Sequence, residues 1–276
     1  MKVAITGSAG QLGLALQGRL TGHELLLLDL PQYDIGNHRQ TREAITSFRP
    51  EVVVHAAAFT NVDACESDPV SAYRVNALGT QNVAVACQEC GAAMVHVSTD
   101  YVFDGCKNEP YWEWDPPNPQ STYARSKLAG EQIASTLLQR CYIVRTAWLY
   151  SRQGKNFVKS VLRLADERER LQFVTDEVGS PTYAPDLAEA IARLIPSGLF
   201  GIYHFTNSGV CSRFEWARAI LELAGLDPNR VQPTQGFARA AKVPARSELR
   251  NFNGATQLGI VFRPWRDALE DYFRGD

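Results

Sequence analysis

Short apolar runs alternate with longer amphipathic stretches through the first 150 residues, and this alternation constrains the fold more than any other feature. The apolar runs are almost continuous in Val, Ile and Leu, which is typical of parallel strands buried on both faces of a sheet. The sequence therefore predicts an α/β protein, with helices on both sides of a doubly wound parallel sheet. We expect strands at residues 2–6, 24–29, 51–57, 92–99 and 141–150, and helices from about residue 11 and at 39–48, 72–90 and 122–138.

The alternation weakens after residue 150, where the pattern predicts a smaller mixed C-terminal lobe. Residues 226–262 are rich in Pro, Gln, Arg and Gly and favour loops with short elements. The expected domains are residues 1–150 and 151–276, and the apolar segments near residues 174 and 202 are free to return to the first sheet. Helices of the lobe are expected at 156–167, from about 186 and 212, and at 265–273.

Charge and hydropathy exclude several classes of partner. Lys and Arg total 28 against 30 Asp and Glu, a formal net charge of −2, so no excess of cations is present to neutralise nucleic acid or an anionic membrane. No apolar run approaches the roughly 18 residues that span a bilayer, and the run after Met1 is too short for a signal peptide. We expect a cytoplasmic protein with no nucleic acid and no membrane among its partners.

The six cysteines are scattered and lack the paired spacing of a zinc site or a disulfide framework. Cys87 and Cys90 form a C-x-x-C, but they lie at the expected end of a helix that Gly91 closes, and no second pair completes a metal cage. We therefore expect ordinary core cysteines and no metal site.

The segment TGSAGQLG joins the first expected strand to the first helix and places Gly7, Gly10 and Gly13 in a G-x-x-G-x-x-G pattern. In a Rossmann-type fold such glycines permit a tight turn, close approach of the backbone to a pyrophosphate, and tight packing of helix on strand. The free N–H groups at the helix start, around Gln11 and Leu12, favour an anion. The pattern predicts a bound dinucleotide, and the alternative is a tight turn without a ligand.

Asp29 ends the second expected strand, about 20 residues after the glycine turn, where an acid is expected to accept hydrogen bonds from the adenosine ribose. Its charge would repel a 2′-phosphate, which favours NADH over NADPH. Arg39 and Arg42 follow closely and leave NADPH open if their loop folds back. The alternative is that Asp29 is a solvated turn residue.

Tyr123 and Lys127 are four residues apart on an expected helix, so they share one face. A free tyrosine has a pKa of about 10, and a neighbouring ammonium stabilises the phenolate and lowers that pKa toward neutrality. The same lysine could hold the ribose of a nicotinamide nucleotide. The pair predicts acid–base chemistry, while the alternative is an amphipathic turn with a solvated lysine.

Ser98 and Thr99 end a buried strand, at the edge where doubly wound sheets bind ligands. Either hydroxyl could donate a hydrogen bond to a substrate carbonyl, and both could instead be turn residues. The residues alone leave this choice open.

With these groups in this order, the chain resembles the extended short-chain dehydrogenase/reductases, and within them the dTDP-4-dehydrorhamnose reductases. The likeness covers nearly the whole length. Two places depart from the family pattern: Ala124 stands where glycine is usual, and residues 241–252 differ from R-P-x-x-S-x-L. The motifs that carry the resemblance are TGSAGQLG, PEVVVHAAAFTNVDACESDP, AYRVNALGTQNVA, HVSTDYVFDG, YARSKLAGE, VRTAWLYSRQGKNFV, DEVGSPTYAPDLA and FRPWRDAL.

The resemblance implies a catalytic triad of Thr99, Tyr123 and Lys127. The implied reaction is reduction of the C4 ketone of dTDP-4-dehydro-L-rhamnose to dTDP-L-rhamnose by NADPH or NADH. Tyr123 would protonate the ketone oxygen, Thr99 would hydrogen-bond it, and Lys127 would orient the cofactor. Residues 1–150 would bind the dinucleotide and residues 151–276 mainly the nucleotide sugar.

Further contacts follow from the same resemblance. Trp148 would lie against the sugar and Asn156 on the nucleotide-sugar side, while Ala56 and Ala57 would lie beside the cofactor. The resemblance also allows a bound Mg²⁺ and a homodimer.

Two other functions stay open from the sequence. One is a non-catalytic regulatory subunit that binds a dinucleotide, like the β subunit of methionine adenosyltransferase, although an intact triad argues against it. The other is a nucleotide-sugar reductase or epimerase with a different substrate.

Overall fold

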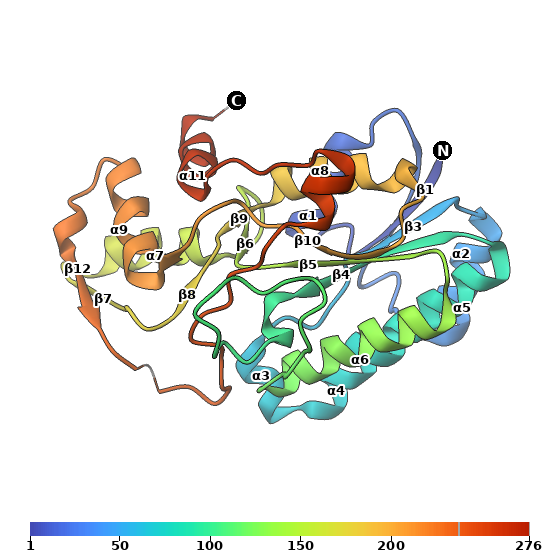
Figure 1. Cartoon of the computed structure of the whole chain (residues 1–276), viewed down its shortest axis with the longest axis horizontal. Helices are drawn as coiled ribbons and strands as arrows, with labels where there is room; N and C mark the ends of the chain where they lie inside the picture. The colour runs from blue at the N-terminus through green and yellow to red at the C-terminus, as the bar shows by residue number, and fades with distance from the viewer. Residues whose placement is uncertain (237, 276) are drawn as a thin grey trace.

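A computed structural model describes residues 1–236 and 238–275. Its centre is a six-stranded sheet in the order β10-β5-β4-β3-β1-β2, in which every neighbouring pair is parallel (Figure 1). The predicted α/β fold with a doubly wound parallel sheet is confirmed. The strands are β1 Lys2–Thr6, β2 Glu24–Leu28, β3 Val52–His55, β4 Ala93–Thr99, β5 Cys141–Thr146 and β10 Gly201–His204.

Helices cover both faces of this sheet (Figure 1). The apolar side chains of α1 and α8 pack on one face, and those of α2, α5 and α6 pack on the other. Both faces of the central strands are therefore removed from water, which explains their unbroken apolar sequences. The bounds are α1 Gln11–Arg19, α2 His38–Phe48, α5 Thr80–Cys90, α6 Thr122–Leu137 and α8 Ala184–Leu194.

The expected helix at 72–90 is three consecutive segments: α4 Pro69–Tyr73, a π-helical turn η1 Arg74–Gly79, and α5. The wider turn contains Asn76, which is 1% exposed. Its amide donates to Ser126 Oγ on α6 at 2.9 Å, and its Oδ1 accepts from Phe59 N–H at 2.8 Å. The π-turn is thus the place where the helix satisfies a buried amide between two other elements.

The C-terminal lobe has its own core, formed by apolar side chains of α7, α9 and α11 around the buried Trp216. The segment expected to be mostly loop contains β12, which pairs in parallel with β7, and the short helix α10. β10 and α8 belong in space to the main sheet and its covering layer. The lobe elements are α7 Phe157–Glu167, α9 Arg213–Leu223, α10 Asn253–Leu258, α11 Trp265–Arg274, β6 Leu149–Tyr150, β7 Leu171–Val174, β8 Val178–Gly179, β9 Thr182–Tyr183, β11 Cys211–Ser212 and β12 Val231–Thr234.

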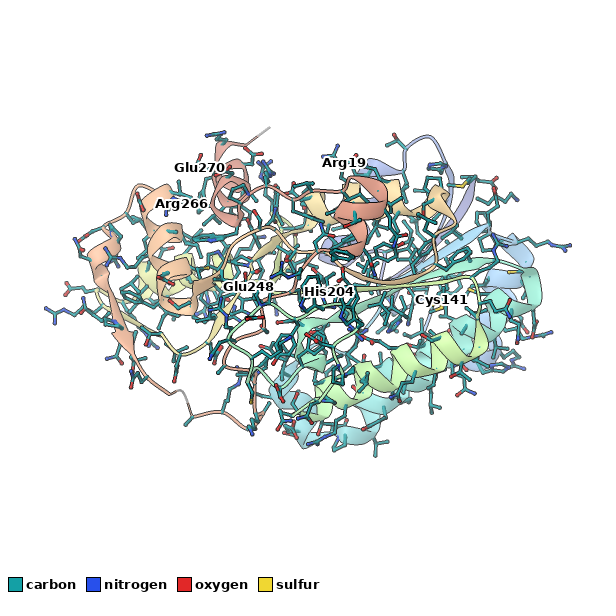
Figure 2. The ribbon with its side chains drawn as sticks, viewed as in Figure 1. Arg19, Cys141, His204, Glu248, Arg266 and Glu270 are labelled. Atoms are coloured by element: carbon teal, nitrogen blue, oxygen red, sulfur yellow. The ribbon has the colours of Figure 1, made fainter. Side chains whose placement is uncertain are left out.

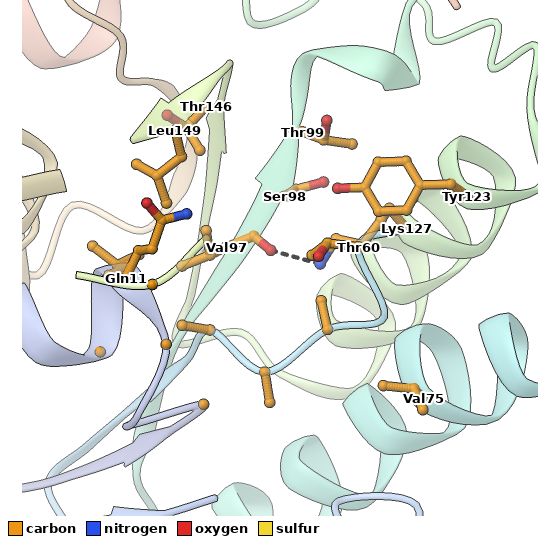
Figure 3. A pocket seen from close by; sticks show the side chains of 18 of the residues that line it. Gln11, Thr60, Val75, Val97, Ser98, Thr99, Tyr123, Lys127, Thr146 and Leu149 are labelled. Carbon is orange, nitrogen blue, oxygen red and sulfur yellow. Dashed lines mark hydrogen bonds between the residues drawn. The ribbon is translucent and has the colours of Figure 1, made fainter. Parts of the chain in front are cut away.

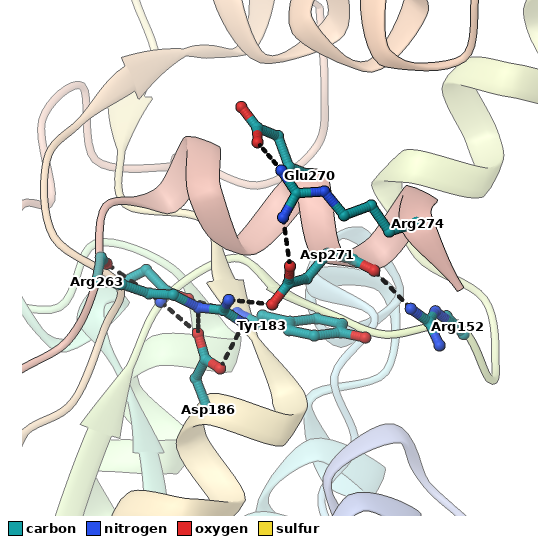
Figure 4. Close-up of polar contacts among 8 residues, drawn as sticks. Arg152, Tyr183, Asp186, Arg263, Glu270, Asp271 and Arg274 are labelled. Carbon is teal, nitrogen blue, oxygen red and sulfur yellow. Dashed lines mark hydrogen bonds and ion pairs between the residues drawn. The ribbon is translucent and has the colours of Figure 1, made fainter. Parts of the chain in front are cut away.

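Arg263 joins the last helix to the layer that covers the sheet (Figure 4). Its guanidinium donates to both carboxylate oxygens of Asp186 on α8, each at 2.9 Å, and also to Asp271 on α11. The hydrogen bond and charge of Arg263 lower the pKa of Asp271. Arg152 donates to the main-chain oxygens of Asp271 and Tyr272. Two cations thus hold α11 in place.

Side chains fill the space between sheet and helices, with His204 and Cys141 among them, while Arg19 lies at the periphery (Figure 2). The six cysteines are free, and only Cys106 is exposed. The C-x-x-C pair ends α5, and Gly91 closes the helix with a φ of +74°, as predicted. None of the helices in the described part of the chain has the length and hydrophobicity needed to span a bilayer.

A buried ion pair fixes α6 against the sheet. Arg145 on β5 donates to both carboxylate oxygens of Glu131 on α6, with Nη2 to Oε2 at 2.7 Å and Nε to Oε1 at 3.0 Å. The two side chains are 3% and 5% exposed. Each charge is stable there only because the other is present.

Glu131→Gln should lower the free energy of unfolding by about 3–5 kcal/mol, because it leaves the Arg145 guanidinium buried without its counter-charge. Urea denaturation followed by circular dichroism measures this. The matched control is Glu167→Gln, which removes the partner of Arg163 in a pair that is 64% and 49% exposed. That change should cost less than about 0.5 kcal/mol. Equal small losses in both variants would show that the buried pair does not stabilise the fold.

Candidate active site

A cavity of about 750 Å³ opens at the carboxyl ends of β1, β3, β4 and β5. Ligands bind at this edge in doubly wound sheets, and the volume is in the usual range for small-molecule sites. Residues from distant parts of the chain meet there. Of the predicted site residues, the cavity is lined by Gly7, Gly10, Gln11, Leu12, Gly13, Asp29, Ala56, Ala57, Thr99, Tyr123, Lys127 and Trp148.

The glycine turn has the shape that a bound pyrophosphate needs. Gly7 has a φ of +70°, and a Cβ there would lie 2.7 Å from the main-chain N of Ala57. A Cβ on Gly13 would lie 2.3 Å from the carbonyl O of Gly7, so α1 can approach β1 this closely only with glycine. Gly10 precedes α1 without any side-chain cap. The N–H groups of the first turn are therefore available to an anion, and the turn fits the diphosphate of a dinucleotide.

Asp29 lies on the cavity wall at the end of β2. Its Oδ2 accepts a hydrogen bond from Ala9 N–H at 2.7 Å, and its Oδ1 accepts one from Leu30 N–H at 2.8 Å. The carboxylate thus ties β2 to the glycine turn, and each oxygen keeps a lone pair for a ribose hydroxyl. Arg42, one of the two arginines that could reach a 2′-phosphate, pairs with Glu89 at 2.8 Å. The preference of Asp29 for NADH stays a prediction.

Tyr123 and Lys127 lie one turn apart on α6 and both line the cavity (Figure 3). The helix begins there because the Ser121 hydroxyl accepts a hydrogen bond from the Ala124 N–H and caps the first turn. Lys127 Nζ donates to the main-chain O of Val97 on β4 at 2.7 Å. This bond holds the face of the helix that carries Tyr123 and Lys127 against the end of the strand.

The tyrosine hydroxyl points toward Ser98 and Thr99, the two hydroxyls that the sequence could not distinguish (Figure 3). Thr99 Oγ1 donates to Asp100 Oδ1 at 3.0 Å and accepts from Tyr101 N–H at 3.2 Å. Ser98 Oγ is buried and has no partner among the described residues. Thr99 is thus part of a hydrogen-bonded chain, while Ser98 is not.

Burial dominates the proton affinities of the triad. It raises the pKa of Tyr123, and the hydrogen bond with Thr99 offsets only part of the rise. It lowers the pKa of Lys127 to about 8, against the opposing charge of Glu131 one turn further along α6. We expected Lys127 to bring the tyrosine pKa toward neutrality. Desolvation of the phenol instead keeps Tyr123 protonated, which suits a proton donor.

Three buried polar atoms at the cavity have no partner among the described residues: Ser98 Oγ, Thr146 Oγ1 and Asp100 Oδ2. Native proteins leave few such atoms, because an unsatisfied buried polar group is costly. These three atoms at one cavity therefore fit a site that takes a polar ligand.

Trp148 lines the cavity just after β5 with a φ of +45°, which is uncommon for a residue other than glycine. Its ring packs on Gly179, where a Cβ would lie 2.7 Å from the indole. The Arg213 guanidinium lies 3.4 Å from the ring centroid and also contacts Glu177 at 3.5 Å. Trp148 is therefore held between a strand of the lobe and a cation.

Asn156 lies outside the described cavity wall. Its Oδ1 accepts from Lys159 N–H at 3.1 Å as the N-cap of α7, and its Nδ2 donates to Ser151 O at 2.6 Å and Gln11 Oε1 at 3.2 Å. It reaches the cavity only through Gln11, so its contact with a substrate stays a prediction. The described residues hold no group of three or more His, Cys, Asp or Glu side chains arranged for a metal ion.

Sequence reasoning gave no role to several residues of the cavity wall, including Asp100, Tyr101, Thr146 and Arg213. Asp100 and Tyr101 directly follow Thr99, so the same strand-end argument could have included them. Arg213 begins α9, far along the chain, and no local signal connects it with the site.

Proteins of known function resemble this chain over nearly its whole length. The RmlD substrate binding domain family matches residues 1–275. A dTDP-4-dehydrorhamnose reductase of Mycobacterium tuberculosis is 43% identical over 97% of this chain and 91% of its own length. A solved dTDP-4-dehydrorhamnose reductase from Clostridium acetobutylicum is 41% identical, covers 99% of both chains and superposes with a TM-score of 0.96. One from Bacillus anthracis, in complex with NADP, is 41% identical over 99% of this chain and 98% of its own, with a TM-score of 0.95.

The chain belongs to the RmlD substrate binding domain family. The resemblance stated from its motifs is therefore confirmed, and the match extends across both the main sheet and the C-terminal lobe. The family match and the cavity agree on a nucleotide-binding reductase.

In this RmlD-family chain, Gly13→Ala should weaken dinucleotide binding at least about tenfold, because the new Cβ would displace the Gly7 carbonyl and open the phosphate turn. Gly18→Ala is the matched control on the same helix, since a Cβ there meets nothing within 4 Å. Quenching of protein fluorescence by NADPH measures the affinity, and circular dichroism checks folding. Equal affinities for the two folded variants would contradict the role of Gly13.

Proposed function

We propose that the chain reduces the C4 ketone of dTDP-4-dehydro-L-rhamnose to dTDP-L-rhamnose with NADPH or NADH. The observation that carries the proposal is the convergence of Thr99, Tyr123 and Lys127 in one cavity with the glycine turn. The Mycobacterium tuberculosis relative is named for this reduction, and the Bacillus anthracis relative was solved with NADP. Both are more than 40% identical over nearly the whole chain, which supports the same activity here.

Each residue of the triad has a separate role in the reaction. The bound nicotinamide would supply the hydride, and the protein supplies placement and the proton. Tyr123 donates its proton to the ketone oxygen, since burial keeps the phenol neutral. Lys127 uses one N–H on Val97 O, so its remaining donors are free for the ribose hydroxyls. Thr99 lies beside the phenol and supports the oxygen on which charge develops.

The two halves of the chain have separate roles in this proposal. Residues 1–150 hold the dinucleotide through the glycine turn, Ala56, Ala57 and Asp29. Residues 151–276 mainly hold the nucleotide sugar, and Trp148 at the junction lies against its sugar ring. We also place the reaction in the cytoplasm, because both reactants carry several negative charges and do not cross membranes unaided.

The direct test is oxidation of NADPH and of NADH, followed at 340 nm, with a panel of dTDP- and UDP-linked 4-keto sugars. We expect turnover with dTDP-4-dehydro-L-rhamnose and formation of dTDP-L-rhamnose. A dinucleotide that binds without turnover would favour a regulatory subunit. Tightly retained NAD and activity without added cofactor would favour an epimerase.

Tyr123→Phe should lower kcat by roughly 10²–10⁴-fold, because the ketone oxygen loses its positioned acid. The affinity for NADPH should change less than about threefold, since the ring still fills its place. Tyr73→Phe is the control, because Tyr73 lies on α4 and is 40% exposed. Steady-state kinetics and a fluorescence titration give the two values. Full turnover in Tyr123→Phe would remove Tyr123 from the mechanism.

A further inference from the structure

Asp100 is a buried carboxylate in the cavity wall, and the proposed mechanism of the triad gives it no role. It follows Thr99 at the end of β4, lines the cavity and is 2% exposed. Its Oδ1 accepts the Thr99 hydroxyl at 3.0 Å. Its Oδ2 is buried and has no partner among the described residues. One oxygen is therefore engaged with the triad through the Thr99 hydroxyl.

A threonine hydroxyl has a single hydrogen and can accept two hydrogen bonds. Thr99 already accepts one from Tyr101 N–H at 3.2 Å and gives its hydrogen to Asp100. With Asp100 charged, Thr99 has no hydrogen left for a ketone oxygen. With Asp100 protonated on Oδ1, the carboxylic acid can donate to Thr99 Oγ1, and the threonine hydrogen is released toward the cavity.

We propose that Asp100 is a positioning residue that controls the direction of the Thr99 hydrogen, so that only the neutral acid lets Thr99 support the ketone oxygen. The inference rests on the proposed reduction. No net proton is consumed at Asp100, because a bound nicotinamide would supply the hydride and Tyr123 the proton. Asp100 acts only through Thr99.

The surroundings of Asp100 make both protonation states accessible near neutral pH. Burial raises the pKa of Asp100 to about 6, and the nearby Ser247 and Thr99 hydroxyls and the charge of Arg213 offset only part of the rise. The titratable and charged groups that face it are Tyr101 on the same turn, Tyr123 on α6 and Arg213 on α9, with Glu177 and Arg239 beyond Tyr101.

The test is the pH dependence of kcat from pH 5 to 9 with both substrates saturating. Wild type should lose at least about tenfold in kcat as the pH rises through about 6, because ionised Asp100 withdraws the Thr99 hydrogen. Asp100→Asn should show no such step, since an amide does not titrate. Thr99→Val should be slow at every pH and also lack the step, because Asp100 then has no route to the ketone.

Ser247→Ala provides a variant that leaves both groups in place. Its hydroxyl lowers the pKa of Asp100, so its loss should move the midpoint of the step upward by roughly half a pH unit or more. A step that persists in Thr99→Val would show that Asp100 acts on the substrate directly and would overturn the proposal. A wild-type kcat without a step near pH 6, or a step retained in Asp100→Asn, would overturn it as well.

A second measurement needs no substrate. A carboxyl whose folded pKa exceeds its unfolded value stabilises the fold fully below the unfolded pKa, and this contribution is lost as the pH rises through the folded pKa. Wild type should therefore lose stability relative to Asp100→Asn between about pH 4 and 6 in urea denaturation. A stability difference between wild type and Asp100→Asn that does not change with pH would show that Asp100 does not titrate in this range. It would overturn this inference and leave the proposed function standing. If the stability difference changes with pH as expected but wild type does not reduce the ketone, the proposed function is overturned, and this inference with it.

Discussion

The buried pair of Arg145 and Glu131 is the interaction on which the geometry of the site depends. Glu131 lies four residues after Lys127 and eight after Tyr123, so all three share one stripe of α6. Because neither charge is stable when buried alone, the pair permits only one rotation of the helix about its axis. In that rotation Lys127 reaches the carbonyl of Val97, and the tyrosine hydroxyl faces the end of β4.

The same burial that requires this pairing also sets the proton chemistry. In a dry site the neutral phenol and the neutral carboxylic acid are favoured, and a lysine loses part of its proton affinity. Tyr123 and Asp100 have raised pKa values and Lys127 a lowered one for this single reason. A site arranged in this way holds a proton ready for a developing oxyanion, and its electrostatic interactions are stronger than they would be in water.

The parts predicted correctly from the sequence are those with local causes. Buried parallel strands carry unbroken apolar runs, Gly91 ends a helix by its left-handed conformation, and the spacing of Tyr123 and Lys127 follows from the helical repeat. The features that the sequence did not predict depend on contacts between distant parts of the chain. The effect of Lys127 on the tyrosine pKa was overestimated because desolvation is a property of the packed site. Arg213 reaches the cavity only because the start of α9 lies beside Trp148.

In the proposed function, chemistry and recognition come from different parts of the molecule. The hydroxyl, phenol and ammonium groups project from β4 and α6, which are packed within the main sheet, while Arg213 and Gly179 come from the lobe. Trp148 lies where the two meet, in a strained conformation that both sides maintain. In the proposed function, changes in the lobe would therefore alter which sugar nucleotide fits the Trp148 face without disturbing Tyr123. Conversely, α6, which carries Tyr123, is tied to the sheet through the buried ion pair, so the position of the proposed proton donor is set by the main sheet.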